Sequence, residues 1–389
     1  MRLLPSLLLL IISSFLSYAS VAANEKSEPN PDEIHKQGLA AYDKKDLTTA
    51  IMLWLPNALT SNHANSQLKL GNLFLDQTGE RKNIDHALFW YTRAASQEHA
   101  EAQSKLGHIY YTGKLVNKDI TLALKWLLKA ARNEHAESQY TVATIYSTGI
   151  DVNINLQKAA YWYDKAANNN HTEAQNALAE MYMHGNGIYQ DLNKAFDLYT
   201  KAAAKDHTNA QINLARIYFN GLGQPKNTKK AFELFQKLAS KGDADAQNYL
   251  GDFYKEGIET EKDLVMAFKY YSQAAEQDNL SAQYSLGKMY VNGYGVLMDY
   301  HKGVDLFIKA AKKGHKDAQM DLGVAYFTGK GIAPDSALAY AWFHVAASQG
   351  VKNAYKNKSV IYDKLLPEDK KRAVLLSSEF VEKYGSIKN

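Results

Sequence analysis

The sequence has no cysteine, no strong excess of either charge and, beyond its first residues, no long apolar run. Without cysteine the chain can form neither a disulfide bond nor a thiolate metal site, and it cannot carry a lipid on a cysteine at a signal cleavage point. The 45 basic and 41 acidic residues leave a formal net charge of +4, which does not indicate a nucleic-acid surface. We also expect no stable membrane span in the mature chain.

The first residues show the order of features of a secretory signal peptide. Arg2 is the only charged residue before Glu25, and an apolar run over residues 3–16 is followed by small residues up to Ala23. A basic start, a short apolar segment and small residues at the cleavage point mark such signals. We expect a signal peptide over residues 1–23, with cleavage after Ala22 as the alternative, and a periplasmic or secreted mature chain. An uncleaved anchor is the other interpretation, but the apolar run is shorter than the ~20 residues of a membrane span.

One glutamine recurs every 36 residues through most of the chain. The eight copies are Gln67, Gln103, Gln139, Gln175, Gln211, Gln247, Gln283 and Gln319. A fixed period of this length is the signature of a solenoid, in which each repeat packs only on its neighbours. The question of function therefore becomes which surface the solenoid presents.

Residues 100–135 illustrate one repeat. We expect a first helix (helix A) over about 100–111 and a second helix (helix B) over about 120–132. The residue before helix B is always Asn or Asp, which are good N-caps because they accept hydrogen bonds from the first helical turn. These residues are Asn83, Asp119, Asn155, Asp191, Asn227, Asp263, Asp299 and Asp335. The loop glycine at position 113 and its copies suit a chain reversal, because glycine tolerates a positive φ.

Small and large residues also recur in register. Gly71, Gly107, Gly251 and their equivalents on helix A are expected where two helices approach closely. A column of Phe or Tyr on helix A and the five tryptophans, which share one register on helix B, are expected to fill the core between layers. The column is Phe74, Tyr110, Tyr146, Tyr182, Tyr218, Tyr254, Tyr290 and Tyr326, and the tryptophans are Trp54, Trp90, Trp126, Trp162 and Trp342.

The repeat AEAQSKLGHIYYTGKLVNKDITLALKWLLKAARNEH resembles the Sel1-like repeat, a relative of the tetratricopeptide repeat. The motifs A-x-A-Q-x-x-L-G-x-x-Y, D-x-x-x-A and W-x-x-K-A-A carry the resemblance. It implies an all-α, right-handed α-solenoid (superhelix) of helix-turn-helix repeats, with eight copies over residues 64–350. Residues 31–63 look like a tetratricopeptide-like hairpin, residues 351–389 are expected to be C-terminal capping helices, and residues 24–30 are expected to be a disordered leader.

Six histidines share one position between a helix B and the next helix A: His63, His99, His135, His171, His207 and His315. A metal ladder is one interpretation. Copies one repeat apart are separated by about 20 Å, from two stacked helices at ~10 Å each, and cannot share an ion whose ligands lie ~2 Å from its centre. We favour a structural role and expect no metal and no cofactor. No Ser/His/Asp or Glu/Asp constellation recurs at a catalytic spacing.

The surface that varies between repeats is where we expect binding. In the related tetratricopeptide fold, helix A lines the concave face. The first stripe on this face is Asn72, His108, Thr144, Glu180, Arg216, Asp252, Lys288 and Val324. The second stripe is Leu75, Tyr111, Ser147, Met183, Phe219, Lys255, Val291 and Phe327. The charges of the first stripe alternate in sign, which fits either a self-neutralising ladder or a partner groove.

Exposed apolar clusters with a charged rim often mark protein interfaces. The predicted protein-binding residues are Tyr111, Tyr140, Glu180, Met183, Ile212, Arg216 and Phe219. The alternative is that the apolar members pack inward in a tightly wound superhelix.

We therefore expect a non-enzymatic, exported scaffold that binds a protein or peptide from the bacterial envelope or from a host. The resemblance to exported Sel1-like proteins implies a role in envelope assembly or in host interaction, such as virulence or host-cell entry. A periplasmic enzyme or binding protein of peptidoglycan or β-lactam chemistry is the alternative. The Sel1-like branch linked to β-lactams has paired cysteines in each repeat, which this chain lacks. A repeat reader of RNA would need a basic groove, which the charge balance does not indicate.

Overall fold

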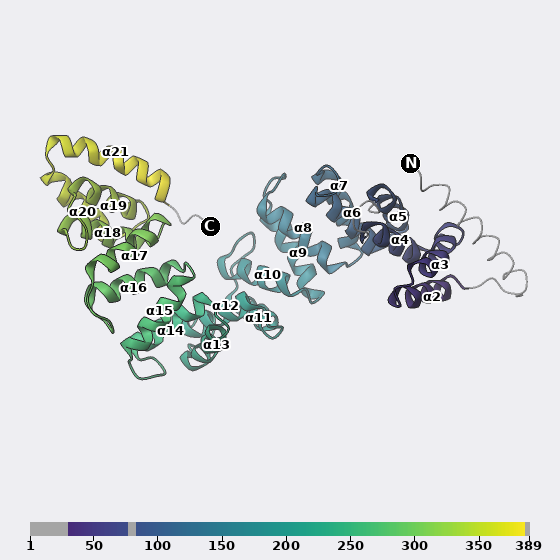
Figure 1. Ribbon diagram of the computed structural model, residues 1–389, viewed down its shortest axis with the longest axis horizontal. Coiled ribbons are helices and arrows are strands. Elements are labelled where there is room, and N and C mark those ends of the chain that lie inside the picture. Colours follow the sequence, from purple (N-terminus) through teal and green to yellow (C-terminus); the bar gives the residue numbers. More distant parts are fainter. Residues whose placement is uncertain (1–29, 77–82, 386–389) are drawn as a thin grey trace, which may run out of the picture. The chain divides into compact units, whose positions relative to one another are not determined.

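The computed structural model describes residues 30–76 and 83–385, and within these ranges every regular element is a helix (Figure 1). This confirms the predicted all-α solenoid. The predicted signal peptide and residues 24–29 of the predicted leader lie outside the described residues. The last leader residue, Asn30, is ordered as the N-cap of the first described helix, because its side chain accepts the backbone N–H of Asp32 at 2.9 Å.

Helix A and helix B alternate along the chain. The helices are α2 (Pro31–Asp43), α3 (Leu47–Leu59), α4 (Ala64–Asp76), α5 (Ile84–Ser96), α6 (Ala100–Thr112), α7 (Ile120–Arg132), α8 (Ala136–Thr148), α9 (Leu156–Asn168), α10 (Thr172–His184), α11 (Leu192–Ala203), α12 (Thr208–Asn220), α13 (Thr228–Ser240), α14 (Ala244–Glu256), α15 (Leu264–Glu276), α16 (Leu280–Asn292), α17 (Tyr300–Lys312), α18 (Lys316–Thr328), α19 (Ser336–Ser348), α20 (Lys352–Lys364) and α21 (Pro367–Tyr384). None of the helices in the described ranges is long and apolar enough to cross a membrane.

The chain forms two compact units, Met1–Lys205 and Asp206–Asn389. The first contains α2–α11 and the second α12–α21. Within each unit, a helix A packs against helix B of its own repeat and against helix B of the preceding repeat. Each repeat therefore buries its apolar faces on its neighbours, as expected of a solenoid.

The predicted N-cap residues and loop glycines stabilise the hairpin between helix A and helix B of each repeat. All eight predicted Asn and Asp residues are N-caps of helix B, and the Asp119 side chain, for example, accepts the Leu122 N–H at 2.9 Å. The Asp119 N–H in turn donates to the Tyr110 carbonyl at 3.0 Å and ties the loop to helix A. Gly113 ends α6 with φ +64°, a left-handed conformation that favours glycine.

Helix crossings occur at the predicted small residues. A Cβ added to Gly71 would lie 2.6 Å from the Tyr91 ring, and one added to Gly323 would lie 2.7 Å from the Phe343 ring. A side chain at either glycine would therefore displace the ring that helix B packs against it. The large residue that fills each crossing comes from helix B and is buried: Tyr91, Leu127, Tyr163, Tyr199, Phe235, Tyr271, Phe307 and Phe343.

Two predicted core columns are less buried than expected. The aromatic column on helix A is half-buried, and lysines of helix B lie over several of its rings, with the Lys158 ammonium 5.1 Å from the Tyr146 ring centroid. Trp126 and Trp162 are also half-buried, whereas Trp54 and Trp342 are buried. The prediction that Trp126 and Trp162 are core residues was wrong, because in the central repeats this position lies at the margin of the core.

The recurring glutamine links three successive helices. Gln103 is buried, its Nε2 donates to the carbonyl of Ala95 at the end of the preceding helix B (3.1 Å), and its Oε1 accepts from Asn133 one helix B later (3.2 Å). The same amide contact joins Gln67 to Gln97 and Gln319 to Gln349. A buried amide must satisfy both its donor and its acceptor, so the position tolerates little change.

The C-terminal helix α21 packs along α19. The outward-facing residues Ala337, Ala341 and Val345 of α19 are buried, whereas the equivalent residues of α7 are Thr121, Lys125 and Lys129. Phe380 and Tyr384 of α21 cover Trp342, with ring centroids 4.8 and 5.3 Å away, and Arg372 pairs with Asp335 at 2.7 Å. The largely apolar sequence of α19 is therefore explained by the helix that covers it.

Candidate protein-binding surface

Three of the eight residues of the first stripe form hydrogen bonds with buried tyrosines of helix B. Tyr91 donates to Asn72 at 2.8 Å and Tyr271 donates to Asp252 at 2.6 Å, each from helix B to helix A of the same repeat. The Tyr163 hydroxyl lies 3.2 Å from the Thr144 hydroxyl. Where helix B instead supplies Leu127, Phe235, Phe307 or Phe343, the stripe carries His108, Arg216, Lys288 or Val324. In these three repeats the stripe residue therefore meets the need of a buried tyrosine hydroxyl for a hydrogen-bond partner.

In the first unit, the predicted residue Tyr140 lies at an inter-repeat contact. It is half-buried, and its ring stacks on His171 with centroids 4.6 Å apart and planes 17° apart. Burial raises the pKa of Tyr140. Tyr111 and Met183 are half-buried, while Glu180 is exposed and accepts from Asn176 at 3.0 Å. Of these four residues, Glu180 is the most accessible.

In the second unit, Ile212 was assigned wrongly to the surface. Only 7% of it is exposed, because it packs in a core cluster with Phe235 and Phe253. Its helix position faces the next repeat rather than solvent. Arg216 is exposed and Phe219 is half-buried against the same cluster. Of the seven predicted residues, four lie in the first unit, which ends at Lys205, and three lie in the second.

The second stripe is the more continuous apolar surface. Tyr111, Met183, Phe219 and Val291 are half-buried, and Phe327 is 47% exposed. Val324 of the first stripe is 36% exposed and lies one turn before Phe327 on α18. The sequence reasoning placed both residues on the stripes but did not select them as binding residues. The sequence could have indicated them, because α18 has an apolar residue at both stripe positions.

Apolar residues also project from loops between helix A and helix B, which the sequence reasoning missed. Tyr189 is 97% exposed and Leu297 is 88% exposed. The equivalent residues of the other repeats are Arg81, Asn117, Asn153, Pro225, Glu261 and Ala333, so no other repeat has a large apolar side chain at this loop position. A comparison of this position between the copies would have revealed the two residues.

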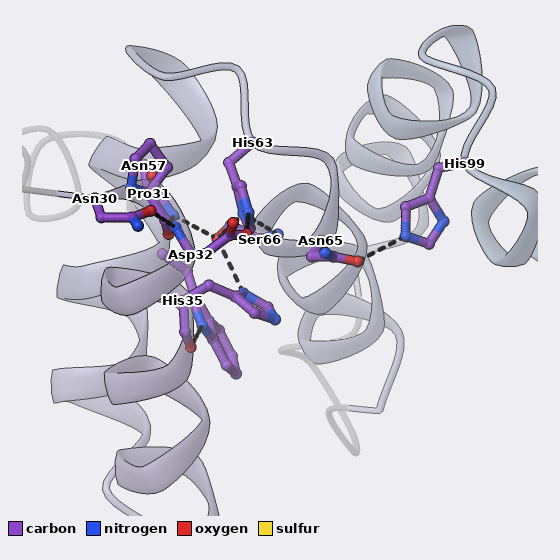
Figure 2. Close-up of polar contacts among 10 residues, drawn as sticks. Asn30, Pro31, Asp32, His35, Asn57, His63, Asn65, Ser66 and His99 are labelled. Carbon is purple, nitrogen blue, oxygen red and sulfur yellow. Dashed lines mark hydrogen bonds and ion pairs between the residues drawn. The ribbon is translucent and has the colours of Figure 1, made fainter.

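The column of histidines consists of helix N-caps. His99 Nδ1 accepts the Ala102 N–H at 3.3 Å, and His135, His171, His207 and His315 cap α8, α10, α12 and α18 in the same way. The other ring nitrogen reaches the preceding repeat, as in the contact of His99 Nε2 with Asn65 Oδ1 at 2.8 Å (Figure 2). This confirms the structural role at the junction. Burial lowers the pKa of His99, His135 and His315.

Near the N-terminus, one of these caps has the connectivity of a catalytic triad. His63 Nε2 lies 3.0 Å from Asp32 Oδ1, and His63 Nδ1 lies 3.0 Å from Ser66 Oγ (Figure 2). Serine hydrolases use a catalytic triad of Asp, His and Ser, in which the histidine activates the serine hydroxyl. The sequence reasoning missed this arrangement, because its only signal is His-x-x-Ser at the start of a helix A.

The geometry assigns Ser66 to the cap rather than to nucleophilic attack. Ser66 is fully buried, and Asn57 Nδ2 donates to its hydroxyl at 3.0 Å while His35 Nδ1 lies 3.1 Å away (Figure 2). His63 Nδ1 also accepts the Ser66 N–H at 3.2 Å, which is the cap bond of the other repeats. His135 and Ser138 repeat the arrangement, and Ser138 is also fully buried. A substrate carbonyl cannot reach either hydroxyl in this conformation.

The repeats themselves identify the family. The Sel1 repeat family matches residues 64–99, 100–135, 136–171, 172–207, 208–243, 244–279, 280–315 and 316–351. The chain belongs to the Sel1-repeat proteins. Such proteins are generally scaffolds for protein–protein interaction and typically not enzymes.

Solved structures agree with this assignment. A protective antigen present in uropathogenic Escherichia coli strains, which displays an SLR fold, is 27% identical over 91% of this chain and 85% of its own, with a TM-score of 0.67. A Sel1 repeat protein from Oxalobacter formigenes is 28% identical over 85% of this chain and 93% of its own, with a TM-score of 0.59. A search of curated proteins gave no significant match.

Proposed function

We propose that this Sel1-repeat protein is an exported scaffold that binds a protein or peptide partner on the helix-A face of its repeats. The observation that carries the proposal is the second stripe, in which large apolar side chains remain accessible on several helices A of each unit. A solvated face would carry polar residues at these positions, and accessible apolar clusters commonly mark interfaces.

The separation of each repeat into recurring framework positions and variable stripe positions supports this proposal. The glutamine, the small crossing residues and the caps recur and hold the fold, whereas the stripe residues differ from repeat to repeat. Because stability comes from the recurring residues, the varied positions can be used for recognition at little cost to the fold. The three to four large apolar residues in each unit would act as anchors, with charged neighbours as the rim.

Export is proposed from the N-terminal sequence, and the biological setting from the similar proteins. Arg2 and the apolar run of residues 3–16 have the form of a signal peptide. The similar Escherichia coli protein is a protective antigen, which fits a protein displayed to a host. We propose a role in envelope assembly or host interaction, including virulence and host-cell entry. N-terminal sequencing of the exported protein should give Asn24 or Ala23 as the first residue. A membrane-bound form that keeps residues 1–20 intact would contradict a cleaved signal peptide.

The binding face is tested by affinity capture with the mature chain, using envelope extract and host lysate, followed by mass spectrometry. Phe327→Ser should reduce the recovery of a specific partner while leaving circular dichroism unchanged, since Phe327 is accessible. Tyr355→Ser is the matched control, because Tyr355 is similarly exposed but lies on α20, which follows the eight repeats. Equal recovery by the wild type and by Phe327→Ser, or loss with Tyr355→Ser alone, would show that the helix-A face is not the binding face.

A further inference from the structure

A cationic and aromatic cluster lies at the end of α12, within the second unit. The Lys226 ammonium is 5.5 Å from the centroid of the Phe219 ring, and Phe219 meets Tyr249 edge-on with centroids 6.1 Å apart. Arg216 precedes Phe219 by one helical turn, and it is close enough to Tyr249 to oppose the rise of that residue's pKa on burial. Two cations therefore flank two half-buried aromatic rings.

The two cations are not neutralised within the fold. Arg216 and Lys226 are exposed, and neither has a carboxylate oxygen within 4.0 Å in the part of the chain that the structure describes. The nearby acids are engaged by other donors. Asp252 accepts the hydroxyl of Tyr271 at 2.6 Å, and Asp245 accepts from Asn279 at 2.6 Å.

The repeat two copies later has an internal carboxylate that the Arg216 neighbourhood lacks. There the residue equivalent to Arg216 is Lys288, and its ammonium pairs with Asp321 of the next helix A at 3.2 Å. The residue equivalent to Asp321 in the Arg216 neighbourhood is Tyr249. The same framework position thus holds an internal carboxylate in one repeat and an aromatic ring in the other.

We propose that Arg216 and Lys226 bind carboxylate side chains of an acidic, apolar segment of a protein partner, with Phe219 and Tyr249 as the surface for its apolar side chains. This inference rests on the proposed function and specifies the chemistry of the partner. The partner's carboxylate supplies the negative charge beside Arg216 that Asp321 supplies beside Lys288. Charge-assisted hydrogen bonds to arginine give orientation as well as attraction, and the aromatic rings contribute apolar area.

The test uses a labelled synthetic peptide of alternating Glu and Leu residues, acetylated at its N-terminus and amidated at its C-terminus, so that side chains supply the only carboxylates. Its binding to the mature full chain is measured by fluorescence anisotropy. A second peptide has every Glu replaced by Gln. We expect the Glu peptide to bind about tenfold more tightly than the Gln peptide, with an affinity that falls as salt rises, because exposed charges are screened.

The variants Arg216→Gln and Lys226→Gln should each remove most of this preference, and Lys229→Gln is the control, because Lys229 is exposed on helix B of the same repeat. Circular dichroism verifies that each variant is folded. Equal affinity for the two peptides, or a preference that survives both substitutions together, would overturn the inference. If Phe327→Ser abolishes capture of the natural partner while Arg216→Gln and Lys226→Gln do not affect it, the proposed binding face stands and the acidic partner is wrong.

Discussion

The hydroxyl of Tyr271 donates a hydrogen bond to Asp252 Oδ1 at 2.6 Å, across the hairpin of α14 and α15. Tyr271 is fully buried, and burial raises the pKa of Asp252 above its usual value. The same two positions in the repeat of α18 and α19 are occupied by Val324 and Phe343, an apolar combination. The chain thus contains two solutions to one packing problem, one polar and one apolar.

Tyr271→Phe should destabilise the second unit by about 1–3 kcal/mol, because it leaves a largely buried carboxyl group without its donor. The double variant Tyr271→Phe with Asp252→Val copies the Phe343 and Val324 combination. It should recover most of that loss, since replacing both partners by apolar groups is often nearly neutral. Urea unfolding followed by circular dichroism measures both variants. A double variant less stable than Tyr271→Phe alone would contradict this account.

Acidification should weaken the helix caps formed by histidine. The pKa values of His99, His135 and His315 are lowered by burial in the folded chain, whereas a histidine in the unfolded chain has a pKa of about 6.5. Between these values the unfolded state binds more protons, so stability falls with falling pH. The contribution is fully present above pH ~6.5 and is lost as the pH drops toward the folded pKa. The melting temperature should therefore decrease between pH 7.5 and pH 5.5.

The control for this pH dependence replaces His99, His135 and His315 together by asparagine. Asn279 already caps α16 through its side chain, so asparagine fits the position. The triple variant should keep its melting temperature near neutral pH and lose less of it on acidification, because an asparagine cap does not titrate. The same loss in the variant as in the wild type would assign the pH dependence to other groups.

Two tryptophans in the same register should respond differently to truncation. Trp54→Ala should cost about 3–5 kcal/mol, because Trp54 is fully buried and its Nε1 donates to the His35 carbonyl at 3.2 Å. Trp126→Ala should cost less than half of this, since Trp126 is half-buried beside Lys125 and Lys129. Thermal melting compares the two variants directly. Equal losses would mean that Trp126 is as much a core residue as Trp54.

Removal of α21 should expose the apolar outer face of α19. A chain that ends at Leu366 would uncover Ala337, Ala341 and Val345 together with Trp342, and such apolar patches promote association. We expect stronger binding of a hydrophobic dye and a larger species in sedimentation velocity. Arg372→Ala, which removes only the exposed ion pair with Asp335, should do neither, because such pairs contribute ~0–1 kcal/mol. A monomeric truncated chain with unchanged dye binding would contradict this role of α21.

Much of the architecture could be read from the sequence because the same physical constraint recurs in every repeat. Three recurring features each satisfy a local requirement. Glycine at position 71 and its copies allow close approach of two helices, and the Asn or Asp before each helix B caps a helix end. The recurring glutamine donates to a backbone carbonyl at the end of the preceding helix B. Eight repetitions make such requirements visible without coordinates. The departures in the framework are the half-burial of Trp126 and Trp162 and that of the aromatic column on helix A, and they concern the margin of the core, which the period alone cannot locate.

The candidate binding surface was predicted less well. The fold class, the repeat boundaries and the stripes that vary could be predicted without coordinates, because they follow from period and residue type. Which stripe residues are accessible depends on how successive repeats pack. This packing buries Ile212, places Tyr140 on His171, leaves Phe327 exposed and sets Tyr249 rather than a carboxylate beside Arg216. The accessibility of a side chain depends on what the neighbouring repeat places against it, and that neighbour lies far away in the sequence, as His171 lies 31 residues from Tyr140.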